Sequence, residues 1–99
     1  MGDVYRRGLI KVGWVTESGD IYKGLLKIGW VTNSGDVYYR GFIKVGWVDS
    51  SGNLYRGLYK VGWVTSSGDV YIGLSKVGWI TGTSNIYLIG GAALLLLVE

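Results

Sequence analysis

Residues 60–71 read Lys60-Val61-Gly62-Trp63-Val64-Thr65-Ser66-Ser67-Gly68-Asp69-Val70-Tyr71, and variants of this stretch recur from one end of the chain to the other. Residues 66–68 form a three-residue connection with glycine last, which is typical of a hairpin loop whose final residue is left-handed. Pairing outward from this loop gives three cross-strand pairs: Thr65 with Asp69, Val64 with Val70, and Trp63 with Tyr71. Because side chains alternate along a strand, the aliphatic pair and the aromatic pair fall on opposite faces. The stretch therefore predicts a β-hairpin.

The same unit occurs five times, at a spacing of 16 or 17 residues. Aligned on the turn glycine, the copies start at Gly2, Gly19, Gly35, Gly52 and Gly68, and a partial copy starts at Ser84. A tyrosine follows each tryptophan at a constant distance, in the pairs Trp14/Tyr22, Trp30/Tyr38, Trp47/Tyr55, Trp63/Tyr71 and Trp79/Tyr87. Constant spacing indicates a structural repeat, whose units bury their apolar faces only against one another.

The 17-residue copies carry one extra residue before the second glycine, at Arg6-Arg7 and at Tyr39-Arg40. An insertion inside a strand would move every later side chain to the other face. The pattern downstream is unchanged, so the segment Arg-Gly-Leu predicts a second turn or a bulge. Each repeat then holds two short strands. We expect an all-β fold, an antiparallel meander of about ten strands in a radial, barrel-like or solenoid arrangement.

Two further columns describe the faces of these strands. The first, which we expect on the face of the tryptophans, is Val12, Ile28, Val45, Val61 and Val77. The second, on the opposite face, is Gly13, Gly29, Gly46, Gly62 and Gly78. Glycine at such a position marks the close approach of another backbone or of a ring. Both faces are largely apolar, so we expect packing on both sides, around an axis or against neighbouring subunits.

The chain divides into a repeat domain, residues 1–88, and an apolar C-terminal tail, residues 89–99. The tail is too short to span a bilayer as a helix, which needs ~20 residues. It lacks alternation, so we expect it to be buried on all sides, within the subunit or in a partner. The residues expected to mediate assembly are Leu94, Leu95, Leu96, Leu97 and Val98.

Composition excludes several kinds of chemistry. The 99 residues include no cysteine and no histidine, so disulfides, thiolates and the commonest general base are absent. We expect no catalytic residues, no metal site and no cofactor, and therefore no enzyme. The net charge of +3 is small, and we expect no nucleic-acid partner. The first residues enter the repeat directly and show no signal-peptide pattern.

Two polar columns have both a functional and a structural interpretation. Asp3, Asp20, Asp36 and Asp69 could bind calcium, but one carboxylate per repeat favours turn chemistry with the neighbouring threonine. The basic column is Lys11, Lys27, Lys44, Lys60 and Lys76, accompanied by Arg6, Arg7, Lys23, Arg40 and Arg56. Interleaved with aromatics it could bind an anionic polymer, or it could simply protect sheet edges.

The motifs resemble those of known repeat families. Residues 60–73, Lys-Val-Gly-Trp-Val-Thr-Ser-Ser-Gly-Asp-Val-Tyr-Ile-Gly, resemble short Gly-Asn-Val-Tyr-x-Gly repeats of uncharacterised bacterial and archaeal proteins. They also look like the hairpins of four-fold beta flower proteins, and this likeness covers residues 2–88. That resemblance implies a closed or radial all-β fold. Gly-Asp-Val-Tyr-x-Gly is similar to the MORN repeat, which implies contact with a membrane or partner, and Gly-Trp-Val-Thr…Tyr is similar to choline-binding repeats.

These patterns favour the first of three functions and leave the other two as alternatives. The first is a non-catalytic structural protein that assembles with itself into an oligomer or filament, using its apolar faces and the tail. The second is a module that binds carbohydrate or cell wall by stacking sugars on ten rings: Trp14, Trp30, Trp47, Trp63, Trp79, Tyr22, Tyr38, Tyr55, Tyr71 and Tyr87. An alternative interpretation of these rings is cross-strand packing within the core. The third is a membrane-associated module with the tail as its peg.

Overall fold

The computed structural model describes residues 2–40 and 43–98, which form ten antiparallel strands followed by one helix. The strands are β1 (Gly2–Arg6), β2 (Ile10–Val15), β3 (Asp20–Lys23), β4 (Leu26–Val31), β5 (Asp36–Tyr39), β6 (Ile43–Val48), β7 (Asn53–Arg56), β8 (Tyr59–Val64), β9 (Asp69–Ile72) and β10 (Ser75–Ile80), and the helix is α1 (Ile86–Leu96). Each strand pairs with its neighbours in sequence, and β1 pairs with β10, so the sheet closes into a barrel. The expected all-β meander in a barrel-like arrangement is confirmed.

Two kinds of turn alternate along the meander and therefore lie at opposite ends of the barrel. We call residues 16–19, 32–35, 49–52 and 65–68 the base turns. In the last of these, Gly68 has a φ of 97° and its amide donates to the Thr65 carbonyl at 3.0 Å. Trp63 pairs with Tyr71 and Val64 with Val70, as predicted. A left-handed glycine closing a three-residue loop therefore sets the register of this hairpin.

The opposite end, which we call the rim, is formed by the turns within the strand pairs β1–β2, β3–β4, β5–β6, β7–β8 and β9–β10 together with their flanking residues. Three of these turns are two-residue loops that start with a glycine at a φ of 62–63°, Gly24, Gly57 or Gly73, as type II′ hairpins require. In the first turn Arg6 pairs with Ile10, so the extra residue lies in the loop. The predicted second turn is confirmed.

Closure of the barrel joins two incomplete repeats. After β10 the chain turns away into α1, and β1 takes the place of the missing partner strand, with Val4 opposite Ile80 and Tyr5 opposite Trp79. The expected pair of Trp79 with Tyr87 is therefore wrong, because Tyr87 lies in α1 and Trp79 stacks on Tyr5. The first half-repeat completes the last one.

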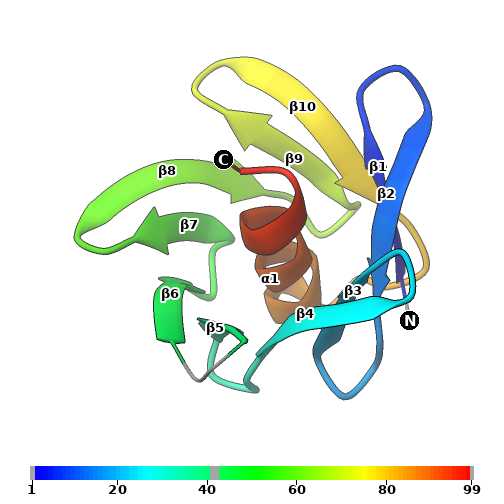
Figure 1. Cartoon of the computed structure of the whole chain (residues 1–99). Helices are drawn as coiled ribbons and strands as arrows, with labels where there is room; N and C mark the ends of the chain where they lie inside the picture. Colours follow the sequence, from blue (N-terminus) through cyan, green and yellow to red (C-terminus); the bar gives the residue numbers. More distant parts are fainter. Residues whose placement is uncertain (1, 41–42, 99) are drawn as a thin grey trace.

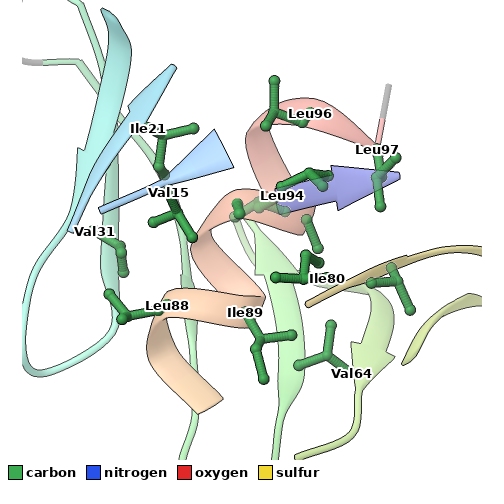
Figure 2. Packing of buried hydrophobic residues seen from close by; sticks show 14 of the residues in the cluster. Val15, Ile21, Val31, Val64, Ile80, Leu88, Ile89, Leu94, Leu96 and Leu97 are labelled. Carbon is green, nitrogen blue, oxygen red and sulfur yellow. The ribbon is translucent and has the colours of Figure 1, made fainter. Parts of the chain in front are cut away.

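Helix α1 lies at the centre of the ring of hairpins (Figure 1) and runs from base to rim. Its N-cap is Asn85, whose Oδ1 accepts hydrogen bonds from the amides of Tyr87 and Leu88. The helix is apolar on every side, as a helix enclosed on every side must be. Val15, Ile21 and Val31 pack on one side of it in Figure 2, and Val64 and Ile80 on another.

The predicted burial of the tail is confirmed within the chain. Every residue from 88 to 98 is buried except Leu95, which is half-buried, and Glu99 lies outside the described residues. The boundary expected between residues 88 and 89 falls inside the helix, which begins at Ile86. The glycine column faces this helix: a Cβ at Gly46 would overlap the carbonyl oxygen of Tyr55 and lie 3.0 Å from Cδ2 of Leu94. Close backbone approach therefore explains those glycines.

The valine column does not lie on the face of the tryptophans. In the β5–β6 pair, Val37 is opposite Gly46 and Tyr38 is opposite Lys44, which leaves Val45 as a β-bulge. Each of the five hairpins has the same register shift, and the bulged residues Val12, Ile28, Val45, Val61 and Val77 pack against the core. A bulge breaks the two-residue alternation. It therefore brings the preceding lysine onto the tryptophan's face.

Candidate binding surfaces

Each tryptophan stacks on a tyrosine of the next hairpin. Ring centroids are 5.1–5.5 Å apart and the planes differ by 9–14° in the pairs Trp14–Tyr22, Trp30–Tyr38, Trp47–Tyr55, Trp63–Tyr71 and Trp79–Tyr5. These rings are half-buried, and the residues between them along the strands point into the barrel. The cross-strand pairing is confirmed, but the pairs lie on the outer face and not in the core. We call these ten rings the aromatic belt.

The second face of each indole is also covered. Lys44 Nζ lies 5.7 Å from the Trp47 ring centroid and 2.9 Å from Oδ1 of Asp36. The register sets Asp36 and Tyr55 on opposite sides of Trp47, so a lysine–aspartate pair flanks one ring face and a tyrosine the other. The same ion pair joins Lys11 to Asp3, Lys27 to Asp20 and Lys76 to Asp69 at 2.8–3.1 Å. A flat sugar therefore finds no free indole face in this conformation.

In three of these pairs the aspartate favours the charged form of the lysine. The hydrogen bond that Lys44 donates to Asp36 raises the pKa of Lys44 despite desolvation, and the bonds to Asp20 and Asp69 raise the pKa of Lys27 and Lys76 in the same way. All three ammonium groups are solvent-accessible, so the pairs add little stability. They organise the belt, and the closed sheet leaves no edge for these lysines to protect.

The aspartate column also takes part in turn chemistry. The amide of Asp20 donates to Oγ1 of Thr16 at 3.0 Å, and Asp36 and Asp69 repeat this contact. In the third copy Asp49 replaces the threonine, and its Oδ1 accepts hydrogen bonds from the amides of Ser51 and Asn53. Across residues 2–40 and 43–98, no three carboxylates gather closely enough to hold a metal ion.

The rim carries the exposed apolar side chains. Among the described residues, all large hydrophobic side chains that are exposed lie there: Leu9, Ile10, Leu25, Leu26, Tyr39, Ile43, Leu58, Tyr59 and Leu74. Leu25 is 98% exposed, Leu58 88% and Leu74 97%. We call Leu9, Leu25, Leu58 and Leu74 the tip leucines. Exposed apolar residues gathered on one face mark an interaction surface.

Charge is distributed along the same axis. All ten lysines and arginines lie in the rim half of the barrel, in the rim turns or within two residues of them. The acidic residues among those described, Asp3, Glu17, Asp20, Asp36, Asp49 and Asp69, lie in the base half. The barrel is therefore polarised, with its apolar side chains at the cationic end. The expected basic column is real, but its grouping with the tip leucines was not foreseen, although a leucine follows the rim glycine in four copies.

Two arginines fix the helix beneath the rim. Arg56 Nη2 donates to the carbonyl of Leu94 at 3.1 Å and to that of Val98 at 3.4 Å, and Arg6 Nη2 donates to that of Leu96 at 3.1 Å. The last carbonyls of a helix lack partners within the helix, and a cation is favourable there. The wall thus clamps the end of α1.

Grooves separate adjacent hairpins near the rim. One of them, with a volume of about 320 Å³, is lined by Lys44, Val45, Gly46, Trp47, Gly57 and Leu58. An equivalent groove of about 190 Å³ is lined by Lys11, Val12, Gly13, Trp14 and Gly24. We call the first the Leu58 groove. The bulged valine forms part of both grooves, so the grooves follow from the repeat itself.

Neither a family model nor a curated protein nor a solved structure matches this chain. The resemblances to repeat families therefore stay predictions. No helix among residues 2–40 and 43–98 is long and apolar enough to cross a bilayer. The residues expected to mediate assembly, Leu94 to Val98, lie inside the barrel with only Leu95 half-buried, and the ten predicted stacking rings are split, nine in the belt and Tyr87 in the helix.

Proposed function

We propose that the protein is a non-catalytic module that docks its rim onto an anionic membrane surface. The observation that carries this proposal is the coincidence, at one end of the barrel, of the exposed apolar side chains with all ten cationic residues. Hydrocarbon accepts the leucines, and anionic headgroups accept the cations. In the membrane-associated alternative that the sequence left open, the tail was the peg. The tip leucines replace it in this proposal, because the tail fills the barrel.

The magnitudes are sufficient for reversible binding. Complete burial of a leucine contributes about 1.5–3 kcal/mol, and a cation near an anionic surface about 1 kcal/mol. Partial insertion of four tip leucines together with a few cations therefore approaches the ~8 kcal/mol of a micromolar dissociation constant. Several weak contacts on one rigid ring add up because the barrel orders them before binding.

Backbone strain at one tip supports a role for the exposed leucines. Leu9 is the only described non-glycine residue with a positive φ, at 69°, and its side chain is 78% exposed. A left-handed conformation costs a side-chain-bearing residue about 1–2 kcal/mol. Neither packing nor conformation favours leucine at this position, whereas a membrane contact does.

Self-assembly, the function expected first from sequence, would use the same rim. Two rims meeting face to face would bring two sets of cations together, and although four lysines of each set are paired with aspartates, like charges among the others oppose such contact. Stacking rim on base would set the leucines against polar turns that expose no large hydrophobic side chain among the described residues. A bilayer satisfies both the apolar and the charged components of the rim. The covered indole faces likewise favour the bilayer over a glycan.

Vesicle sedimentation tests the proposal. The wild type is expected to sediment with vesicles that contain phosphatidylserine and weakly with pure phosphatidylcholine. The variant L25S/L58S/L74S is expected to lose binding at least about tenfold, since each substitution removes a leucine worth more than 1 kcal/mol. The control N33A/S50A/S66A, in the base turns, should bind like the wild type. Equal binding by both variants would refute the proposal, and a concentration-dependent mass in light scattering that only L25S/L58S/L74S abolishes would favour self-assembly.

A further inference from the structure

The Leu58 groove combines apolar walls with a cation. Val45, Gly46, Leu58 and the Trp47 indole form the walls, and Lys44 lies at one side. Its volume of about 320 Å³ is at the lower end of the range of ~300–1,000 Å³ that holds small ligands. The groove is open to solvent, lies between two hairpins and reaches the rim at Leu58, a tip leucine.

We propose that the Leu58 groove binds a single alkyl chain that ends in an anionic head, with the chain along Val45 and Leu58 and the head at Lys44. This inference deepens the proposed membrane docking and rests on the same rim, because the chain could belong to a bilayer lipid. It could also belong to a free fatty acid. The shared chemistry is an alkyl group that carries a carboxylate or phosphate.

The lysine at the groove can accept such a head without losing its present partner. An ammonium group has three donors, and Asp36 accepts one hydrogen bond from Lys44 at 2.9 Å. The aspartate and the Trp47 ring hold Nζ over the indole, beside the apolar walls. Because the cation is already held beside the apolar walls of the groove, the groove favours a ligand that has both an apolar chain and a negative charge over a ligand that has only one of them.

The bulge explains why the repeat produces this groove. Val45 is the extra residue of the β5–β6 pair, so it is not directly opposite a partner and stays half-buried between hairpins. In the β3–β4 pair the equivalent residue is Ile28, and its larger side chain is 6% exposed and belongs to the core. Ile28 therefore packs into the core, whereas Val45 lines the groove. We therefore expect the groove lined by Val12 to bind the same class of molecule more weakly, in line with its smaller volume.

Titration of the ¹⁵N-labelled full chain with decanoate, below its micelle concentration and without any bilayer, tests the inference. The largest shifts are expected at the amides of Gly46 and Gly57 and at the Trp47 indole. Leu58→Ser should abolish these shifts, whereas the matched variant Leu74→Ser, at a tip two strands further on, should leave them intact. Both residues are exposed, so neither change should unfold the barrel. Shifts that survive in L58S, or that vanish equally in L74S, would overturn the inference.

A cationic amphiphile and a lysine variant test whether the head group of the ligand must be negatively charged. Decyltrimethylammonium should bind more weakly than decanoate, and Lys44→Gln should weaken decanoate binding about twofold to fivefold, as expected for an exposed ion pair. Equal affinity for the two amphiphiles would contradict the anionic head. If the protein binds decanoate but does not sediment with vesicles, the groove binds a free fatty acid and only the proposed membrane docking is refuted. If it binds vesicles but not decanoate, only the proposed ligand site in the groove is refuted.

Discussion

The indole of Trp79 stacks on the phenol ring of Tyr5, with ring centroids 5.5 Å apart, and thereby joins the last strand of the barrel to the first. Four other tryptophans make the same contact with a tyrosine that follows them in the chain. Only at the β10–β1 junction does the partner come from the other end. Closure of the ring therefore depends on β1, which pairs with β10 at Val4, Tyr5 and Arg6.

Tyr5→Ala should destabilise the barrel by about 2–4 kcal/mol. The change removes aromatic stacking, which is worth about 0.5–1.5 kcal/mol, and the burial of a large ring. Urea denaturation followed by circular dichroism measures the effect. The control Tyr59→Ala removes a tyrosine that is 77% exposed at the rim and should change stability by less than about 0.5 kcal/mol. Equal losses in the two variants would show that closure does not depend on this stack.

Gly90 lets the helix approach the barrel wall, so its replacement should be harmful despite alanine's higher helix propensity. A Cβ at Gly90 would lie 2.5 Å and 2.6 Å from the two γ-carbons of Val48. We expect Gly90→Ala to cost about 1–3 kcal/mol through overpacking. Val48→Ala removes both γ-carbons, so the double variant should recover part of the loss, with a coupling of at least about 0.5 kcal/mol in a double-mutant cycle. Strictly additive effects would contradict the contact.

Arg56 should matter more than a surface arginine normally does. Its guanidinium donates to the carbonyls of Leu94 and Val98 at the end of α1, so Arg56→Leu is expected to cost about 1.5–3 kcal/mol in thermal or urea denaturation. Arg56→Lys should restore little, because an ammonium cannot reproduce the forked geometry. Lys23 is the equivalent residue of the second repeat and is exposed. Lys23→Leu should therefore be nearly neutral, and a comparable loss in that control would argue against the clamp.

Much of the fold could be predicted from the sequence because the same hairpin pattern occurs in five copies. The glycine at the end of Ser66-Ser67-Gly68 fixes the loop type, and the loop type fixes which residues face each other. The tail was expected to be buried because residues 89–98 carry no polar side chain. These inferences are local, or follow from polarity alone, and the structure confirms them.

The features that the sequence did not predict depend on contacts between distant parts of the chain. Tyr87 keeps the repeat spacing after Trp79, but Asn85 caps a helix there, and the apolar run that follows is stabilised inside the barrel. The bulge at Val45 was also missed, since a bulge changes the facing of residues without changing their spacing. The rim was not recognised from the sequence either, because only the folded barrel shows that Leu9 and Leu58 are exposed.

The hydrogen bonds to Asp49 predict an acid-sensitive contribution to stability. Desolvation raises the pKa of this carboxyl, but hydrogen bonds from Asn53 and Ser51 outweigh it and lower the pKa below its ordinary value. A lowered folded-state pKa stabilises the protein above the unfolded-state pKa of about 4, and that stability is lost as the pH falls through the folded-state value. Wild type should therefore lose an advantage over Asp49→Ala between about pH 5 and pH 2 in urea denaturation. A constant difference between the two proteins across this range would contradict the assignment.

Binding to anionic vesicles should depend on salt in a way that separates the two components of the rim. Raising the ionic strength from about 0.1 M to about 1 M shortens the screening length from ~10 Å to ~3 Å. The contribution of the lysines and arginines should therefore fall steeply, while that of the tip leucines persists. Wild type is expected to keep residual binding at high salt, measured by sedimentation, whereas L25S/L58S/L74S should lose it completely. The variant K23Q/R40Q, which removes two exposed cations, should bind more weakly than the wild type at low salt and equally well at high salt. If the wild type detaches completely at high salt, the leucines do not enter the bilayer and the attachment is electrostatic alone.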